Sequence, residues 1–172
     1  ISAGVEVKRV DTANWIAVNT EAIVGVGDVI RTDATGVARI TFFSDGVETE
    51  IQPDSVFQID VFEDRGGDSF GLSSQLLLGR SLQRVARLLD ATSSYDINTP
   101  SMELTVRGTE FMIRVEESGR AAMLVTDGIA GAAASGQDSE VPAGFGIRSS
   151  EDGAGLSDVV EAADFDQLDA AI

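Results

Sequence analysis

The stretch NTPSMELTVRGTEFMIRVEE, residues 98–117, contains a change in apolar alternation that predicts how the chain turns. Its apolar residues alternate with polar ones, as on a half-buried strand, but the alternation changes phase around Gly108. The apolar positions are even before this glycine and odd after it: Met102, Leu104 and Val106, then Phe111, Ile113 and Val115. Successive side chains of a strand point to opposite faces, so both sets reach one interior only if the chain bends or bulges. The pattern predicts two strands joined by a corner at Gly108.

Arg107 and Glu110 flank this corner, and the alternation predicts that both point outward. One interpretation is that they recognise a partner. The other is that they brace the corner, by pairing with each other or with nearby backbone. No basic or aromatic cluster accompanies them in the sequence, which favours bracing.

Asp-Gly pairs mark two further turns between apolar alternating stretches. Asp45-Gly46 separates VARITFF (37–43) from VETEIQ (47–52), and Asp127-Gly128 follows a second apolar run. Both central residues of a type I′ hairpin turn need positive φ, which Asp tolerates and Gly prefers. These signals predict an all-β fold: a twisted β-sandwich or solenoid-like roll of short antiparallel strands and Asp-Gly hairpins, with a short C-terminal helix.

The domain boundaries follow from changes in composition. Residues 1–148 are expected to form the β domain, in one piece or as two lobes, 1–62 and 76–148, joined by a polar loop at 63–75. Residues 76–90 fit both a helix and a pair of strands, and the surrounding β pattern favours strands. Residues 149–172 are expected to form an acidic tail with a short amphipathic helix, capped by Ser157-Asp158 and covering a sheet edge.

Composition argues against several classes of binding partner and structural feature. The net charge of −17 and the pI near 4.1 argue against binding nucleic acid or anionic membranes. No apolar run in this chain approaches the roughly 20 residues of a membrane span. Cysteine is absent, so the chain contains no disulfide and no thiolate metal ligand.

The sequence offers no catalytic or cofactor-binding constellation. Histidine is absent, which removes the ordinary serine and cysteine triads and any imidazole metal ligand. Carboxylate groups such as Asp164, Asp166 and Asp169 are of the type that binds calcium, but their spacing does not follow the calcium-loop pattern. A solvated acidic surface is the favoured interpretation, with calcium unsupported. We expect a protein that is not an enzyme, with no catalytic, cofactor or metal site.

The order of motifs resembles the FecR domain family, which includes the extracytoplasmic part of bacterial sigma regulators. The matching pieces are GDVIRTDATGVARITFFSDG (27–46), IQPDSVFQI (51–59), SSYDINTPSMELTVRGTEFMIRV (93–115), VTDGIAG (125–131) and VPAGFG (141–146). The resemblance implies an all-β, non-enzymatic module, with no catalytic role for the shared residues. It assigns a fold signature to Asp28, Arg31, Thr32, Gly46, Arg107, Gly108, Thr109 and Phe111, to which we add Asp45, Thr99, Pro100, Glu110, Asp127 and Gly128 from the turns and the TP block.

The resemblance leaves two functional expectations. FecR-type sigma regulators have a cytoplasmic domain and a membrane span before this domain, and neither stands in the sequence given. We therefore expect a secreted or cell-surface module that acts through protein–protein contacts, including a self-assembling structural subunit. The alternative is the periplasmic sensor domain of a transmembrane anti-sigma regulator. Both place the chain outside the cytoplasm, and the start at Ile1 suggests a processed product or an excised segment.

Overall fold

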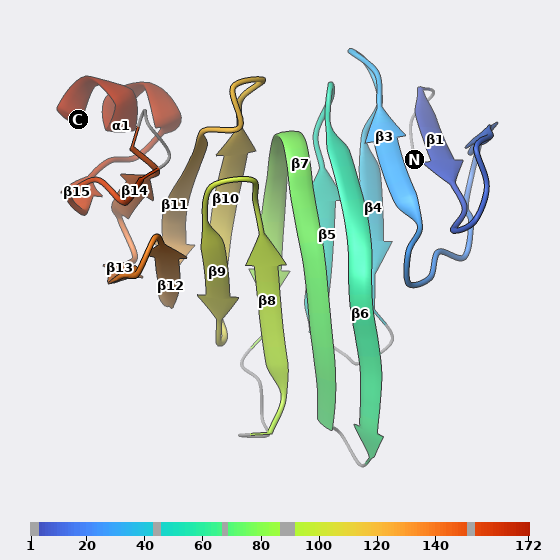
Figure 1. The fold of residues 1–172 in the computed structure, drawn as a ribbon, viewed down its shortest axis with the longest axis horizontal. Helices are drawn as coiled ribbons and strands as arrows, with labels where there is room; N and C mark the ends of the chain where they lie inside the picture. Colours follow the sequence, from blue (N-terminus) through green and yellow to red (C-terminus); the bar gives the residue numbers. More distant parts are fainter. Residues whose placement is uncertain (1–3, 43–45, 67–68, 87–91, 151–153) are drawn as a thin grey trace.

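A computed structural model describes residues 4–42, 46–66, 69–86, 92–150 and 154–172. These residues form fifteen strands and one short helix (Figure 1). The strands are β1 (Val5–Lys8), β2 (Trp15–Ala17), β3 (Val29–Thr32), β4 (Ala38–Thr41), β5 (Val47–Ile51), β6 (Val56–Gly66), β7 (Ser69–Val85), β8 (Ser94–Asn98), β9 (Glu103–Val106), β10 (Glu110–Val115), β11 (Ala121–Asp127), β12 (Ile129–Ala134), β13 (Gln137–Pro142), β14 (Phe145–Arg148) and β15 (Val160–Glu161), and the helix is α1 (Phe165–Ala171).

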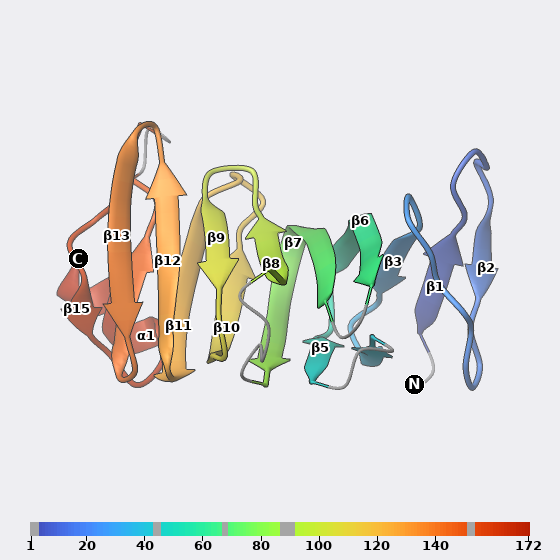
Figure 2. The ribbon, with the colours of Figure 1, turned by 90° about the horizontal axis from the view of Figure 1, so that it is seen from below.

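The strands lie in two layers that share β7 (Figure 2). Sheet A runs in the order β2, β1, β3, β6, β7, β8, β9, β12, β13. Sheet B runs in the order β4, β5, β7, β10, β11, β14, β15. Among the pairings of the described residues only β7 with β8 is parallel, so the prediction of an all-β fold built from antiparallel strands is confirmed.

Strand β7 passes from one layer to the other near Gly79. Its first part pairs with β6 and β8, and its last part pairs with β5 and β10. Gly79 lies against Ser55, whose hydroxyl accepts from Arg80 N at 2.9 Å, and a side chain at Gly79 would overlap Ser55. The preference for strand over helix, expected for 76–90, is confirmed for residues 76–85, and residues 87–90 lie outside the described residues. A loop over 63–75 is wrong, because β6 extends to Gly66 and β7 begins at Ser69.

One apolar core fills the space between the two layers and extends from Val5 to Ile147. It contains a polar bridge between the sheets. Gln83 of sheet B accepts hydrogen bonds from Tyr95 of sheet A, at 2.9 Å, and from Thr49, at 2.5 Å. Burial raises the pKa of Tyr95 to about 12, because the apolar surroundings disfavour the phenolate more than the hydroxyl of Thr49 stabilises it.

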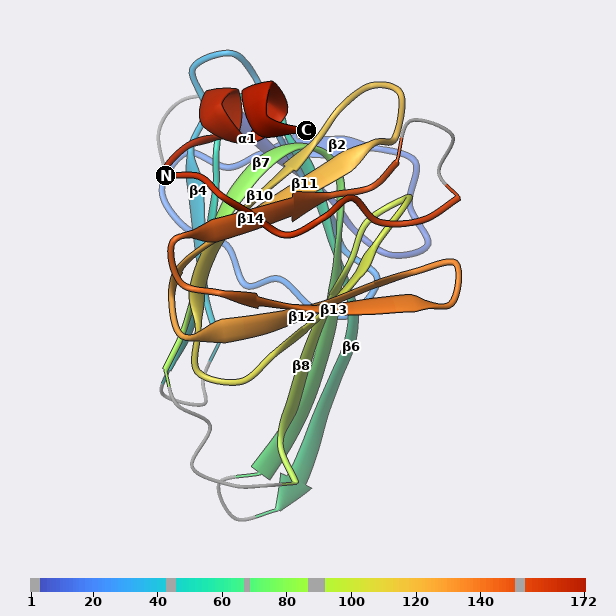
Figure 3. The same cartoon turned by 90° about the vertical axis from the view of Figure 1, so that its left-hand side faces the viewer.

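The C-terminal helix covers the outer face of sheet B (Figure 3). Phe165 and Leu168 pack on Ala122 and Leu124 of β11, so both faces of that strand are buried. The helix also contacts β15, the edge strand of sheet B, and its expected role in covering a sheet edge stays a prediction.

The expected cap of this helix is wrong. Asp164, and not Ser157-Asp158, caps the helix by accepting from Gln167 N at 2.8 Å. Gln167 in turn accepts from Ala163 N at 3.0 Å, so the two side chains satisfy backbone donors at the same helix end. The assignment of 1–148 to a β domain and 149–172 to a tail stays a prediction.

Candidate functional site

The corner predicted at Gly108 is confirmed, and it joins the two sheets. Gly108 has φ +64°, and the chain leaves β9 in sheet A and enters β10 in sheet B. The two apolar sets of residues 98–117 therefore face the same core from opposite layers. This explains the phase change, because the two strands have opposite faces turned inward.

A second corner, at Gly128, packs against the first. Asp127-Gly128 joins β11 of sheet B to β12 of sheet A, so the expected hairpin at this Asp-Gly pair is wrong. Thr109 donates to Ile129 O at 2.8 Å, and Thr126 donates to Glu110 O at 3.0 Å. A Cβ atom on Gly128 would lie 2.6 Å from Gly108 O, closer than carbon and oxygen can approach. The two corners thus form one packed unit.

Arg107 and Glu110 do not pair with each other. Arg107 is exposed and makes no ion pair with any described residue, while the Glu110 carboxylate lies 3.7 Å from Arg84 Nε. The expected bracing by this pair is wrong, and the hydroxyls of Thr109 and Thr126 hold the corner instead. A threonine directly after Gly108, in RGT, and another two residues before Gly128, in TDG, were the available signal.

Near the N-terminus, Asp28 holds loop backbone in place through hydrogen bonds, as Thr109 and Thr126 do at the corners. Its buried carboxylate accepts from Arg9 Nη1 at 2.6 Å and from Gly25 N and Val10 N at 3.0 Å each. Burial by itself would raise the pKa of Asp28, but the two backbone donors and the Arg9 guanidinium outweigh it, and the pKa is lowered. Asp28 therefore ties the residues that follow β1 to the loop that precedes β3.

The remaining signature residues are distributed over the fold and do not form one site. Arg31 pairs with Glu6 and lies 4.0 Å from the centre of the Trp15 ring. The hydroxyls of two threonines organise turns: Thr32 donates to Gln52 O at 2.7 Å, and Thr99 accepts from Met102 N at 2.8 Å.

The other signature residues also lie at separate places in the fold. Phe111 is fully buried, and Pro100 lies beside Gly119. Gly46 has φ +127° where β5 begins, whereas Asp45 falls outside the described residues. The antiparallel pairing of β4 with β5 fits the hairpin expected there.

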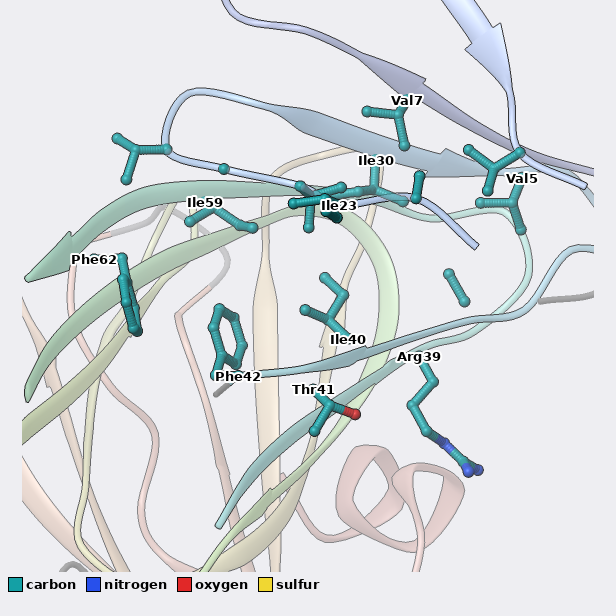
Figure 4. A pocket seen from close by; sticks show the side chains of 16 residues that line it. Val5, Val7, Ile23, Ile30, Arg39, Ile40, Thr41, Phe42, Ile59 and Phe62 are labelled. Atoms are coloured by element: carbon teal, nitrogen blue, oxygen red, sulfur yellow. The ribbon is translucent and has the colours of Figure 1, made fainter. Parts of the chain in front are cut away.

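An apolar cavity of about 320 Å³ lies at the N-terminal end of the sandwich, and sequence reasoning missed it. Strands β1, β3 and β6 of sheet A form one wall, and β4 of sheet B forms the other (Figure 4). Its lining includes Val5, Ile30, Ile59, Ile40, Phe42 and Phe62. The aliphatic residues at 22–24 and 26, within a loop otherwise marked by glycine and acidic residues, were the available signal.

Exposed apolar side chains surround this cavity. Ile23 is 81% exposed, and Val10 and Val26 are each about half exposed. Arg9, bound to Asp28, also donates to Ile23 O at 2.5 Å, which connects this loop to the Asp28 cluster. We call the cavity and these three residues the N-terminal apolar surface.

The lining of the N-terminal apolar surface is almost entirely apolar. Arg39 is the only ionisable residue among the sixteen that line the cavity, and its side chain points away from the interior (Figure 4). No group of three or more acidic residues in the described part of the chain is placed to hold a metal ion. Exposed apolar patches and apolar cavities are the type of surface at which folded domains contact other molecules.

Comparison with known proteins identifies the family. The profile of the FecR protein family matches residues 28–130, which is more than half of the 172 residues. The chain belongs to the FecR family. The match begins at Asp28 and ends just after the second corner, so it contains Asp28 and the paired corners, whereas the residues that contact the Asp28 carboxylate lie before it.

Two solved structures share the FecR fold of this chain. Both are crystal structures of a protein from Parabacteroides distasonis described as a "putative anti-sigma factor", with TM-scores of 0.62 and 0.59 at 14% sequence identity. Each comparison covers 78% of this chain but 58% of the solved chain, so this chain spans less than two thirds of that protein. No curated protein matches the chain.

Proposed function

We propose that this FecR-family chain is the extracytoplasmic, non-enzymatic binding module of an envelope signalling regulator of the anti-sigma type. The FecR match over residues 28–130 carries the proposal. The description of the solved fold neighbours supports it, because they are named for the same regulatory class. No helix in the described part of the chain is long and apolar enough to cross a membrane.

The N-terminal apolar surface supports a role in protein recognition. Exposed apolar patches on folded domains mark contact sites for other molecules, and this surface combines exposed side chains with a cavity. Several signature residues hold corners and turns, among them Thr32, Thr99, Gly108 and Thr109, whereas the N-terminal apolar surface consists of other positions. A self-assembling structural subunit, the other expectation, has no supporting observation among the comparisons.

The regulatory role is testable in the organism that encodes the chain. Deletion of the full gene is expected to change transcription of a set of genes served by an alternative sigma factor. Complementation with the wild-type gene restores the pattern, whereas Ile23→Asp, which places a charge on the N-terminal apolar surface, does not. Glu21→Gln, a change in the same exposed loop, serves as the matched control. An unchanged transcriptome after deletion contradicts the regulatory role.

A further inference from the structure

Strand β4 forms an open edge of sheet B. It pairs with β5 on one side, and no strand of the described residues pairs with it on the other. Phe42 N donates to Val47 O at 3.2 Å, so Phe42 directs its backbone groups toward β5. Because this direction alternates along an antiparallel strand, Arg39 and Thr41 direct their N–H and C=O groups outward. These groups have no backbone partner in the described part of the chain.

The other sheet ends carry features that discourage strand addition. The edge strand β13 has Asp138, Glu140 and Pro142, and the edge strands β15 and β2 are two and three residues long. Proline, charges and short length are the usual protection of exposed edges. Strand β4 (ARIT) has no proline and no inward charge, and it carries β-branched residues at two of its four positions. It is therefore the edge best suited to accept another strand.

The cavity lies directly beneath this edge. Ala38 and Ile40 of β4 point inward and line it, as does Phe42 at the end of the strand. A strand added next to β4 would send alternate side chains to the same inner side. There they would meet the cavity and the exposed Ile23 on its opposite wall. The geometry thus selects an extended segment with apolar residues at alternate positions.

The outer face of sheet B indicates the charge of that segment. Arginines and glutamates alternate from strand to strand: Arg39 lies 2.9 Å from Glu50, Arg84 lies 3.0 Å from Glu48, and Glu110 lies 3.7 Å from Arg84. The series ends at β4 with Arg39, whose side chain is 57% exposed. A carboxylate on the added strand opposite Arg39 would continue it. Repulsion from charges more than about 8 Å away is screened at physiological ionic strength. The preference for an acidic residue therefore rests on the exposed guanidinium of Arg39, which Glu50 and Glu48 already contact at 2.9 and 3.5 Å.

We propose that β4 is a strand-addition site. An extended segment of a partner protein pairs antiparallel with Ala38–Thr41, places apolar side chains over the cavity, and sets an Asp or Glu opposite Arg39. The segment gains backbone hydrogen bonds from the open edge and specificity from the alternating side chains. This inference rests on the proposed protein-binding role and names the class of segment that is bound.

The test uses two labelled peptides and fluorescence anisotropy with the whole chain. The acidic probe is Thr-Val-Glu-Val-Thr-Val, and the basic probe replaces its Glu with Lys. Thr41→Pro removes an outward N–H without touching the bonds to β5, and Thr41→Val is the matched control that keeps it. Arg39→Glu reverses the charge at the edge. Circular dichroism of every variant confirms that the fold is retained.

The wild type and Thr41→Val are expected to bind the acidic probe with Kd below about 1 mM, and Thr41→Pro about tenfold more weakly. Arg39→Glu is expected to prefer the basic probe, and this variant tests the proposal even if Thr41→Pro fails to fold. Absence of binding by the wild type, or equal binding by Thr41→Pro and Thr41→Val, overturns strand addition.

Sedimentation velocity on the unlabelled chain distinguishes a second copy from a partner segment. The chain is expected to remain a monomer at concentrations where the acidic probe binds. A dimer that Thr41→Pro abolishes would overturn the proposed occupant, since the edge would then pair with itself. If the peptides fail while gene deletion still alters transcription, the mode of binding is wrong and the regulatory role stands. If the peptides bind and gene deletion leaves transcription unchanged, strand addition stands and the regulatory role is wrong.

Discussion

Replacement of Gly128 by alanine tests whether the two corners form one packed unit. Gly128 has φ +80°, a conformation that costs an alanine about 1 kcal/mol. The added Cβ would also lie 2.6 Å from Gly108 O and 3.2 Å from Thr109 Cα, both of which are backbone atoms. The backbone must therefore shift, which strains the bonds from Thr109 to Ile129 O and from Thr126 to Glu110 O. Each such bond contributes about 1 kcal/mol, so Gly128→Ala is expected to cost about 3 kcal/mol.

Gly144→Ala is the matched control, because Gly144 has φ +85° with no atom within 4 Å of the added Cβ. This variant is expected to cost about 1 kcal/mol from the backbone alone. Urea unfolding, followed by circular dichroism and by the fluorescence of the single tryptophan, gives both free energies. In thermal unfolding the difference of about 2 kcal/mol corresponds to a Tm lower by about 4–8 °C. Equal losses in the two variants would refute the packing of the corners on each other.

Three further predictions concern ionisable groups. Asp28→Asn is expected to lower the free energy of unfolding at neutral pH by about 2 kcal/mol. Since the pKa of Asp28 is lowered in the fold, the stabilisation from its carboxylate is complete above the ordinary pKa of 3.8 and is lost as pH falls through the folded pKa. The free energies of unfolding of Asp28→Asn and wild type should therefore converge as pH is lowered. Asp169 accepts from Arg114 at 2.7 Å, so Asp169→Asn is expected to speed hydrogen exchange in α1 about fivefold. Glu161→Gln, at an exposed position before the helix, should leave it unchanged. The single tyrosine, Tyr95, should ionise near pH 12 in the folded protein and near pH 10 when unfolded; absorbance titration with a midpoint near 10 in the folded state would contradict its burial. Because its pKa is raised, its contribution to stability is complete below pH 10 and lost as pH rises toward 12.

The candidate site was harder to predict than the fold. Each wall of the N-terminal apolar surface is an ordinary strand with inward-facing aliphatic residues, as at Val5, Ile30 and Ile40. Periodicity assigns such residues to a core, and it does not indicate where the core opens to solvent. The open edge at β4 could not be predicted from periodicity either, because whether a strand has a second partner depends on the order of strands in the sheet.

The all-β class, many of the strands and the corner at Gly108 were predictable from the amino-acid sequence, since these follow from alternation of side chains and from the turn preferences of single residues. Tertiary structure decided which strands became neighbours. It placed β9 and β10 in different layers, turned the Asp127-Gly128 pair into a passage between sheets, and extended β6 and β7 through a stretch rich in glycine and polar residues. The physical reason is that strand pairing uses backbone groups common to all residues, so partner choice depends on how the whole chain encloses its apolar surface.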